Sequence, residues 1–375
     1  MLEAPIKNDR LLATFLDLLQ VKATSCHEAQ MAQKLTILLQ DMGCTVRVDS
    51  AGMQIAGNTG NLIATLPGTL DAPPLLFCAH MDTVQPTDTL QVQRHDGQIT
   101  SDGTTILGAD DRAGIAAILE MLHAVLDAEL PHPTLEIAFT IAEEIGVMGS
   151  MVMDYAPITA RVGFVPDSSG AVGRIITQAP AQVHLDITVH GKSAHAGMAP
   201  EDGISAIVIA AQAISRMTLG RVDDETTANI GTISGGKATN IIPDVVEMEG
   251  EARSRNPQKL TTQVEHMRFC LQLAAEQAGG SVDVDVSDVY PAFNLSSESR
   301  AVILAQQAAW NLGIPSLVMA TGGGSDANFL NQHGIESVIL STGYHNPHGL
   351  NEYQDEAELI RLTEWLYEIV RIAGA

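Results

Sequence analysis

Apolar and polar positions along the first part of the chain follow two alternating patterns. Short apolar runs predict buried strands at residues 75–79, 134–142 and 161–167. A longer apolar pattern at residues 112–128 predicts a helix. Strands that alternate with helices favour a mainly parallel sheet with helices on both faces. We therefore expect an α/β fold in which a mixed, mainly parallel sheet is flanked by helices.

The pattern changes near Gln178, where VHLDITVHG alternates apolar and polar residues as a half-exposed strand does. The patterns that follow predict a helix, two strands, a helix and a strand, at residues 203–217, 226–236, 244–254, 257–279 and 281–289. The order β-α-β-β-α-β is that of a ferredoxin-like α+β unit. Beyond Tyr290 the earlier pattern returns, with helices predicted near residues 299–311 and 356–372 and a strand at 337–341. We predict a larger α/β domain made of residues 1–178 and 291–375, with a smaller inserted domain at 179–290.

Composition limits the classes of function. The chain has 375 residues, 45% of them hydrophobic, which suits a two-domain globular protein. Its net charge of −25 argues against a nucleic acid or an anionic membrane surface as partner. Residues 1–20 lack the apolar core of a signal peptide and predict an amphipathic helix, and no run is long enough to span a bilayer. Four scattered cysteines without CxxC spacing indicate reduced thiols and a cytoplasmic protein.

Candidate chemistry gathers where the predicted strands end. His80 and Asp82 leave the strand at 75–79 in the same direction, at the edge where open α/β sheets place active sites. Further acidic and imidazole side chains follow in GADDRAG (Asp110, Asp111), AEEIGV (Glu143, Glu144), VPDSSG (Asp167) and YHNPHGLNEY (His345, His348). Imidazole and carboxylate ligands without clustered thiolates suit zinc, manganese or cobalt.

Two of these motifs indicate hydrolysis. A carboxylate such as Asp110 can bridge two metal ions, as in two-metal sites. In the pair Glu143–Glu144 one side chain can bind metal while the other stays free as a base for a water molecule. Each motif alone has a simpler interpretation: a solvated strand end for the Glu pair, a hydrogen-bonded histidine for His80, a helix N-cap for Asp110 or Asp111. Their recurrence at successive strand ends favours a metal-dependent hydrolase.

Taken together and in this order, HMD, GADDRAG, AEEIGVMGS, VPD and PHG resemble the co-catalytic metallopeptidase family that includes peptidase T, glutamate carboxypeptidase, acetylornithine deacetylase and succinyl-diaminopimelate desuccinylase. The resemblance covers essentially the whole chain. It implies two divalent metal ions, zinc first and manganese or cobalt as alternatives. The roles it implies are Asp82 as the residue that orients His80, Glu143 as general base, and metal ligands at His80, Asp110, Glu144, Asp167 and His348. His345 is the competitor for the last ligand position, and PHGLNEY fits the family's pattern better.

The inserted domain resembles the lid of the same family. GKSAHAGMAPEDGISA implies that His195 reaches the active site and steadies the oxyanion. KATNIIPD and GEARS imply that Asn240 and Arg253 hold the substrate's terminal carboxylate, which suits the two-point geometry of arginine. The glycine run TGGGSDANFL lacks the spacing of a phosphate loop, and the resemblance makes Gly323 a substrate contact. Dimeric relatives supply the lid histidine from the partner subunit, so we expect a homodimer.

The expected function is hydrolysis of an amide bond in small peptides by a peptidase T-like exopeptidase, an aminopeptidase or tripeptidase. The stretch between Asp82 and Asp110 is shorter than in peptidase T itself, which places the chain in a peptidase T-like branch. Within the family, the alternative is a carboxypeptidase or an N-acyl-amino-acid deacylase. Outside enzymes, the alternative is a non-catalytic, metal-containing binding protein, which the intact Glu143 and metal ligands disfavour.

Overall fold

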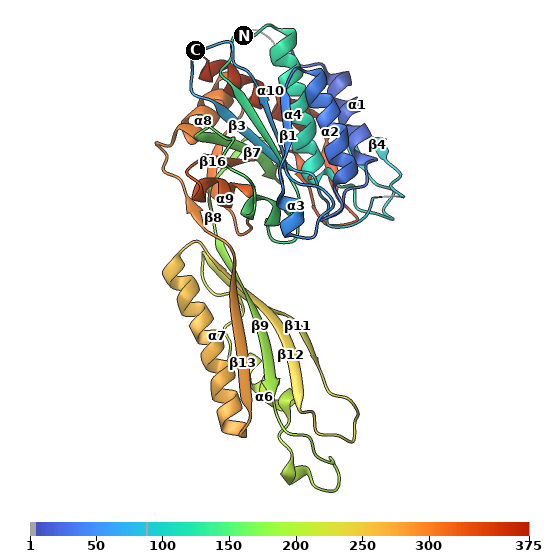
Figure 1. Cartoon of the computed structure of the whole chain (residues 1–375), viewed down its shortest axis with the longest axis vertical. Helices are drawn as coiled ribbons and strands as arrows, with labels where there is room; N and C mark the ends of the chain where they lie inside the picture. The colour runs from blue at the N-terminus through green and yellow to red at the C-terminus, as the bar shows by residue number, and fades with distance from the viewer. Residues whose placement is uncertain (1–4, 88, 375) are drawn as a thin grey trace. The chain divides into compact units, whose positions relative to one another are not determined.

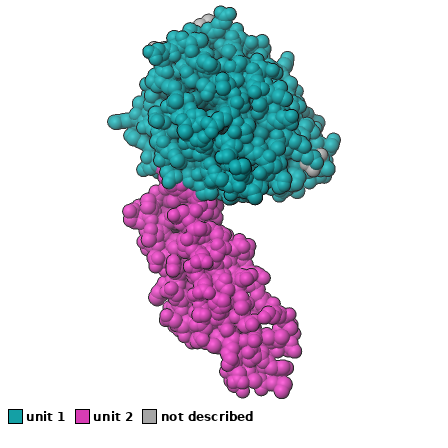
Figure 2. All heavy atoms as spheres, in the orientation of Figure 1, with its two compact units in different colours: residues 1–178, 294–321, 325–375 teal, residues 179–293, 322–324 magenta. Residues whose placement is uncertain are grey.

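The computed structural model describes residues 5–87 and 89–374, so the first four residues of the predicted N-terminal segment lie outside it. The chain divides into two compact units (Figure 2). Unit 1 comprises residues 1–178, 294–321 and 325–375, and unit 2 comprises residues 179–293 and 322–324. The sequence prediction divided the chain after residues 178 and 290.

A large mixed sheet forms the centre of unit 1, with the strand order β1-β2-β6-β3-β7-β16-β8-β14 and with β15 beside β8 (Figure 1). Its inner strands β6, β3, β7 and β16 are parallel to one another. The strands are β1 (Thr45–Val48), β2 (Leu62–Leu66), β3 (Leu75–His80), β6 (Leu135–Thr140), β7 (Val162–Ser168), β8 (Arg174–Ala179), β14 (Phe293–Asn294), β15 (Leu317–Ala320) and β16 (Glu336–Ser341). The expected mainly parallel α/β sheet is confirmed.

Helices cover this sheet. Those of unit 1 are α1 (Asn8–Leu19), α2 (Ala29–Asp41), α3 (Ala51–Gln54), α4 (Ala109–Asp127), α5 (Met148–Met151), α8 (Arg300–Leu312), α9 (Asp326–Gln332) and α10 (Glu356–Ala373). Helix α4 packs on β3 and β7, and α1 and α10 pack on α4, which explains why α4 is buried along most of its length. Gly114 allows this close packing, because a Cβ there would lie 2.4 Å from the carbonyl oxygen of Pro166 in β7.

A small antiparallel sheet in unit 1 holds the last loop of the chain against the loop that precedes α4. Its strand order is β17-β18-β5-β4. The strands are β4 (Gln93–His95), β5 (Gln98–Thr100), β17 (Tyr344–His345) and β18 (Tyr353–Asp355). The loop between β17 and β18 contains His348, so this sheet fixes the two ends of the segment that carries it.

Unit 2 is an antiparallel sheet with two helices. Its elements are β9 (Ala181–His190), η1 (Pro200–Asp202), α6 (Ala206–Ile214), β10 (Gly220–Arg221), β11 (Thr226–Gly235), β12 (Val245–Ser254), α7 (Pro257–Ala278) and β13 (Ser281–Tyr290). The strand order β10-β11-β12-β9-β13 is the ferredoxin-like arrangement with one short extra strand, β10. Burial alternates along β9, where Val183, Leu185, Ile187 and Val189 are buried and belong to the core that the unit's helices share.

Of the helices in residues 5–87 and 89–374, none combines the length and the apolar character that crossing a bilayer requires.

Candidate active site

His80 is the last residue of β3 and is buried. Its Nδ1 atom lies 3.0 Å from the backbone oxygen of Asp82 and 3.4 Å from the Oδ1 atom of Asp82. These contacts with Asp82 fix the orientation of the ring. Because Asp82 holds Nδ1, Nε2 is the nitrogen that can bind a cation. The other nitrogen, Nε2, lies 3.0 Å from Asp110 Oδ1 and 3.7 Å from Asp167 Oδ1.

Asp110 meets a different histidine with each of its two oxygens. While Oδ1 faces His80, Oδ2 lies 3.4 Å from Nε2 of His348. The same Nε2 atom lies 3.0 Å from Oε2 of Glu144, which follows the end of β6. The candidate residues therefore come together from segments that are distant in sequence: the ends of β3 and β6, the start of α4, and the loop between β17 and β18. They meet at the carboxyl edge of the inner strands.

The loop that presents Asp110 is held by Glu352, a residue that the sequence analysis did not single out. The buried carboxylate of Glu352 accepts the backbone N–H groups of Gly108, Ala109 and Asp110 at 2.7, 2.8 and 3.2 Å. Gly108 has a φ of 73°, in the left-handed region that glycine adopts without strain. The sequence signal for Glu352 is its place in NEY, immediately before β18, and this signal becomes meaningful only when the loop around Asp110 is folded.

Asp82 contacts the segment after β6. Its Oδ1 atom accepts the backbone N–H of Glu143 at 3.1 Å, and its Oδ2 atom accepts that of Glu144 at 3.2 Å. The Ser25 hydroxyl donates a further hydrogen bond of 2.6 Å to Oδ2. Burial would raise the pKa of Asp82, yet His80 and these donors hold it below its ordinary value. Asp82 is therefore an ionised residue that links His80 to the backbone of the Glu143–Glu144 pair.

Two groups of side chains in the described part of the chain bring three ligand atoms within 4.8 Å of one another: His80 with Asp110 and Glu144, and His80 with Asp111 and Asp167. Asp111 is a candidate from the GADDRAG motif to which the family resemblance assigns no role. It is fully buried, and one of its oxygens accepts the N–H of Gly114 at 3.1 Å. Glu143 belongs to neither group. Tyr344 donates from its hydroxyl to Asp167 at 3.3 Å.

The electrostatics of this cluster favour positive charge. Contacts with Asp110 and Glu144 raise the pKa of His348 to about 10. Burial alone would lower the pKa of His80, yet Asp110, Asp167 and Asp82 raise it well above its ordinary value. Glu143 differs, because burial itself raises the pKa of its carboxyl and so favours the neutral form. Carboxylates and imidazoles this close together, without clustered thiolates, fit hard or borderline divalent cations. Most of these side chains are buried, whereas His348 has 51% of its side chain exposed.

His345 and Cys78 are two further residues whose side chains could bind a metal ion, and both make other contacts. The His345 ring stacks on Tyr353 with centroids 4.7 Å apart, and it is His348 that contacts Asp110 and Glu144. Cys78, buried in β3, directs its sulfur to Asp326 at 3.6 Å and belongs to neither group of ligand atoms among the described residues.

The remaining predicted residues belong to unit 2. His195 forms an isolated β-bridge with Ile241, and the N–H of Ala196 donates to the backbone oxygen of Asn240 at 3.0 Å. The two predicted segments around His195 and Asn240 therefore lie side by side. Arg253, in β12, forms an ion pair with Glu251 and donates to the Tyr290 hydroxyl at 3.0 Å.

Gly323 lies in open space, since a Cβ built on it would meet no atom within 4 Å. By contrast, a Cβ on the neighbouring Gly324 would lie 2.4 Å from the ring of Tyr290, so that glycine is required by the packing of unit 2.

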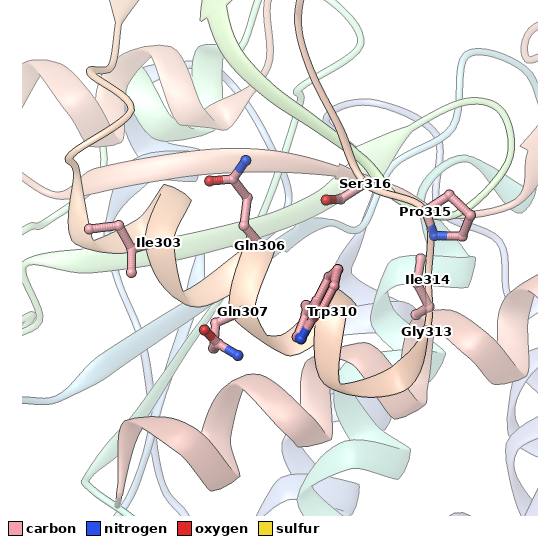
Figure 3. Close-up of a pocket in the computed structure, with 8 residues that line it drawn as sticks. All are labelled: Ile303, Gln306, Gln307, Trp310, Gly313, Ile314, Pro315 and Ser316. Carbon is pink, nitrogen blue, oxygen red and sulfur yellow. The ribbon is translucent and has the colours of Figure 1, made fainter.

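A separate cavity of about 780 Å³ lies beside α8 (Figure 3). Figure 3 shows Trp310 and Gln307 on the helix, with Pro315 and Ser316 on the segment that follows. No lining residue carries an ionisable side chain. This cavity therefore offers no carboxylate or imidazole ligand and no acid or base, and we assign the chemistry to the cluster around His80.

Comparisons with known proteins identify the family of the chain. Residues 61–173 match the family model described as Peptidase family M28, and residues 181–278 match the model described as Peptidase dimerisation domain. The uncharacterised protein YqjE of Bacillus subtilis is 42% identical over 98% of this chain and 100% of its own length. The aminopeptidase PepT of Bacillus cereus is 41% identical, with a TM-score of 0.92 over 99% of this chain and 100% of that structure. A tripeptidase of Staphylococcus aureus is 40% identical, with a TM-score of 0.95 over 99% of both chains.

The matches at 40% identity and above extend over nearly the whole length of both proteins, so they include both units. They confirm the expected family and the expected class of enzyme. The chain belongs to the peptidase T-like metallopeptidases and is a metal-dependent exopeptidase of that family.

Proposed function

We propose that this enzyme is an aminopeptidase that removes the N-terminal residue of tripeptides and other short peptides. The observation that carries the proposal is the position of Asp110 between His80 and His348, with the Glu143–Glu144 pair at the same strand edge. The similar structures named as an aminopeptidase and a tripeptidase support the substrate class.

The proposed metal content is two divalent ions, with zinc as the first choice and manganese or cobalt as alternatives. His80, Asp110 and Asp167 would hold one ion, and Asp110, Glu144 and His348 the other, so that Asp110 bridges both. When bound, the ions supply Lewis acidity to the peptide carbonyl and to the attacking water. The contacts of Asp110 with both histidines support the bridging role.

Glu143 is the proposed general base. Its carboxylate accepts a proton from the attacking water and then returns the proton to the leaving amine nitrogen. Two observations support the role: Glu143 lies outside both groups of ligand atoms, and burial raises the pKa of its carboxyl. Asp82 orients His80 and holds the backbone of the base in place.

Residues of unit 2 are proposed to complete the site. His195 would stabilise the oxyanion with a hydrogen bond, and Arg253 and Asn240 would bind the C-terminal carboxylate of the peptide, with Gly323 lining the pocket. Arg253 already pairs with a carboxylate, that of Glu251, and two hydrogen bonds of 2.8 and 3.0 Å show that its guanidinium can engage one in two-point fashion.

The proposed assembly is a homodimer formed through unit 2. Helix α6 exposes Ile207 and Val208, and strand β11 exposes Ile233, at 43%, 50% and 55% of their surfaces. Apolar side chains exposed together on neighbouring elements indicate an interface, and this segment matches the peptidase dimerisation domain. We place the enzyme in the cytoplasm, which its four unpaired cysteines support.

A panel of substrates tests the proposal and separates it from its rivals. The panel contains a free tripeptide, the same tripeptide with an acetylated N-terminus, its C-terminal amide, and N-acetylated amino acids, each assayed with zinc, manganese or cobalt. Preference for the free tripeptide, with release of the N-terminal amino acid, is the expected result. Preference for the N-acylated compounds would favour a deacylase or carboxypeptidase, and metal binding without turnover would favour the non-catalytic protein.

A further inference from the structure

The backbone after β6 is held in an unusual way. Four consecutive backbone N–H groups each donate a hydrogen bond to a side-chain oxygen, and not to the backbone of a neighbouring strand. These hydrogen bonds run from Ile141 to Asn61 Oδ1 at 3.0 Å, from Ala142 to Glu28 Oε1 at 2.9 Å, from Glu143 to Asp82 Oδ1 at 3.1 Å, and from Glu144 to Asp82 Oδ2 at 3.2 Å. The turn that presents Glu143 is therefore shaped by side chains from other parts of unit 1.

This turn contains a strained residue. Ala142, immediately before Glu143, has a φ of 50°, in the left-handed region that residues with a Cβ rarely adopt. Such a conformation is energetically costly and persists only where the surroundings stabilise it. The carbonyl of Ala142 accepts the N–H of Met148 at 3.0 Å, and its N–H is the group that Glu28 accepts. The contact with Glu28 is thus one of the two backbone contacts that stabilise the strained residue.

Glu28 is placed for this contact rather than for a role in its own helix. It occupies the N-cap position of α2, yet its side chain caps no N–H of that helix. Its Oε1 atom instead accepts the N–H groups of Cys26 and Ala142, both at 2.9 Å. The side chain is fully buried, and among the described residues its Oε2 atom has no hydrogen-bond partner. Burying a carboxylate in this way is costly, which indicates a role that an apolar residue or a local cap would not fill.

We propose that Glu28 is a positioning residue for Glu143: it fixes the Ala142 peptide so that the carboxylate of the next residue faces the attacking water. The proposal rests on the proposed function, in which Glu143 is the base. Glu28 belongs to neither group of candidate metal ligands, so its effect is on the geometry of the base and not on metal binding.

Three substitutions of Glu28 separate the effect of its side-chain length from the effect of its charge. Both hydrogen bonds of Glu28 end on one oxygen, so Glu28→Gln can keep them with its amide oxygen. Glu28→Asp keeps the charge but shortens the side chain by one methylene, and Glu28→Ala removes the acceptor. We expect Glu28→Gln to retain nearly wild-type kcat, and Glu28→Asp and Glu28→Ala to lower kcat by about 10–100-fold, with KM and metal content unchanged.

Glu136→Ala is the matched control. Glu136 lies at the other end of β6, is buried, and accepts the backbone N–H groups of Thr159 and Ala160 at 3.0 and 2.9 Å. Its removal therefore destabilises the same unit in the same way without touching the turn. We expect Glu136→Ala to lower the melting temperature while kcat stays at the wild-type value.

A double-mutant cycle with Glu143→Ala tests the coupling. If Glu28 acts through the base, Glu28→Asp lowers kcat in the wild-type background but leaves the residual rate of Glu143→Ala unchanged. An equal loss in both backgrounds, a loss of kcat in Glu28→Gln as large as in Glu28→Asp, or an equal loss in Glu136→Ala would overturn the proposal. Wild-type turnover in Glu143→Ala itself would instead refute the assignment of the base, so the two failures are distinguishable.

Discussion

Asp110 Oδ1 lies 3.0 Å from His80 Nε2, at a site where the second oxygen of the same carboxylate faces His348 at 3.4 Å. One side chain thus contacts both histidines of the cluster. His80 contacts only one oxygen of that carboxylate. Loss of Asp110 would therefore affect both proposed metal positions, whereas loss of His80 would affect mainly one.

Asp110→Ala is therefore expected to abolish tight binding of both metal ions, whereas His80→Ala weakens mainly one. Titration of the metal-free protein with zinc, with elemental analysis of the product, measures the two affinities. If Asp110→Ala still binds two equivalents with wild-type affinity, the bridging role of Asp110 is wrong.

Glu352 gives a prediction of the opposite kind from Glu28, since its two oxygens are both in use. Oε2 accepts the N–H of Gly108, and Oε1 accepts those of Ala109 and Asp110. In Glu352→Gln one of these groups would meet an amide NH2, so Gln should not rescue. Both Glu352→Gln and Glu352→Ala are expected to weaken metal binding by about 10–100-fold. Wild-type affinity in both variants would show that the loop around Asp110 holds its shape without Glu352.

Glu28 also makes the stability of the metal-free protein depend on pH. Burial raises its pKa from 4.5 to about 7 in the folded protein. Between these values the folded state holds a proton that the unfolded state has released, so this contribution to stability is complete below about pH 4.5 and is lost as the pH rises through about 7. The melting temperature of Glu28→Gln should therefore rise relative to wild type across this window. A difference between the two proteins that is independent of pH would contradict the shifted pKa.

The homodimer and the role of His195 can be tested together. His195→Ala is expected to lower turnover while metal content and melting temperature stay unchanged. If the histidine acts across the subunit interface, mixing inactive His195→Ala with inactive Glu143→Ala protein restores part of the activity, because some heterodimers contain one complete site. Absence of recovery in a mixture that native mass spectrometry shows to contain heterodimers would place His195 in its own subunit's site or outside catalysis.

Most of the secondary structure was predictable from the sequence because its hydrophobic patterns are strong. The helix expected near residues 299–311 is α8 (Arg300–Leu312), and the last helix, expected near 356–372, is α10 (Glu356–Ala373). Some short strands were not predicted: β15 has only four residues, and Leu317 in it is 59% exposed, so no buried face marks it in the sequence.

Some candidate ligands were predictable for a similar reason, since His80, Glu144 and Asp167 lie at or shortly after the ends of buried strands. Asp110 and His348 lie instead at the start of α4 and in the loop between β17 and β18, so their motifs rather than a preceding buried strand identified them. The contacts of Glu28, Asp111 and Glu352 were not predictable in either way. Glu28 and Glu352 accept backbone N–H groups from segments that are far away in the sequence, and these turns exist only in the folded chain. Asp111 was interpreted as a possible helix cap, and its position beside His80 and Asp167 depends on how α4 begins.

Glu143 is the proposed general base and Glu144 a proposed metal ligand, and the Glu143→Ala variant distinguishes these two roles. Glu144 lies 3.0 Å from His348 and belongs to a group of ligand atoms, whereas Glu143 does not. Elemental analysis and tripeptide hydrolysis are measured on the same protein sample. We expect Glu143→Ala to keep the wild-type metal content and to hydrolyse the tripeptide about 10²–10⁴-fold more slowly, which is the typical effect of removing a positioned base. If Glu143→Ala loses one metal equivalent, Glu143 is a metal ligand. If it keeps both metal ions and full activity, Glu143 is not the general base.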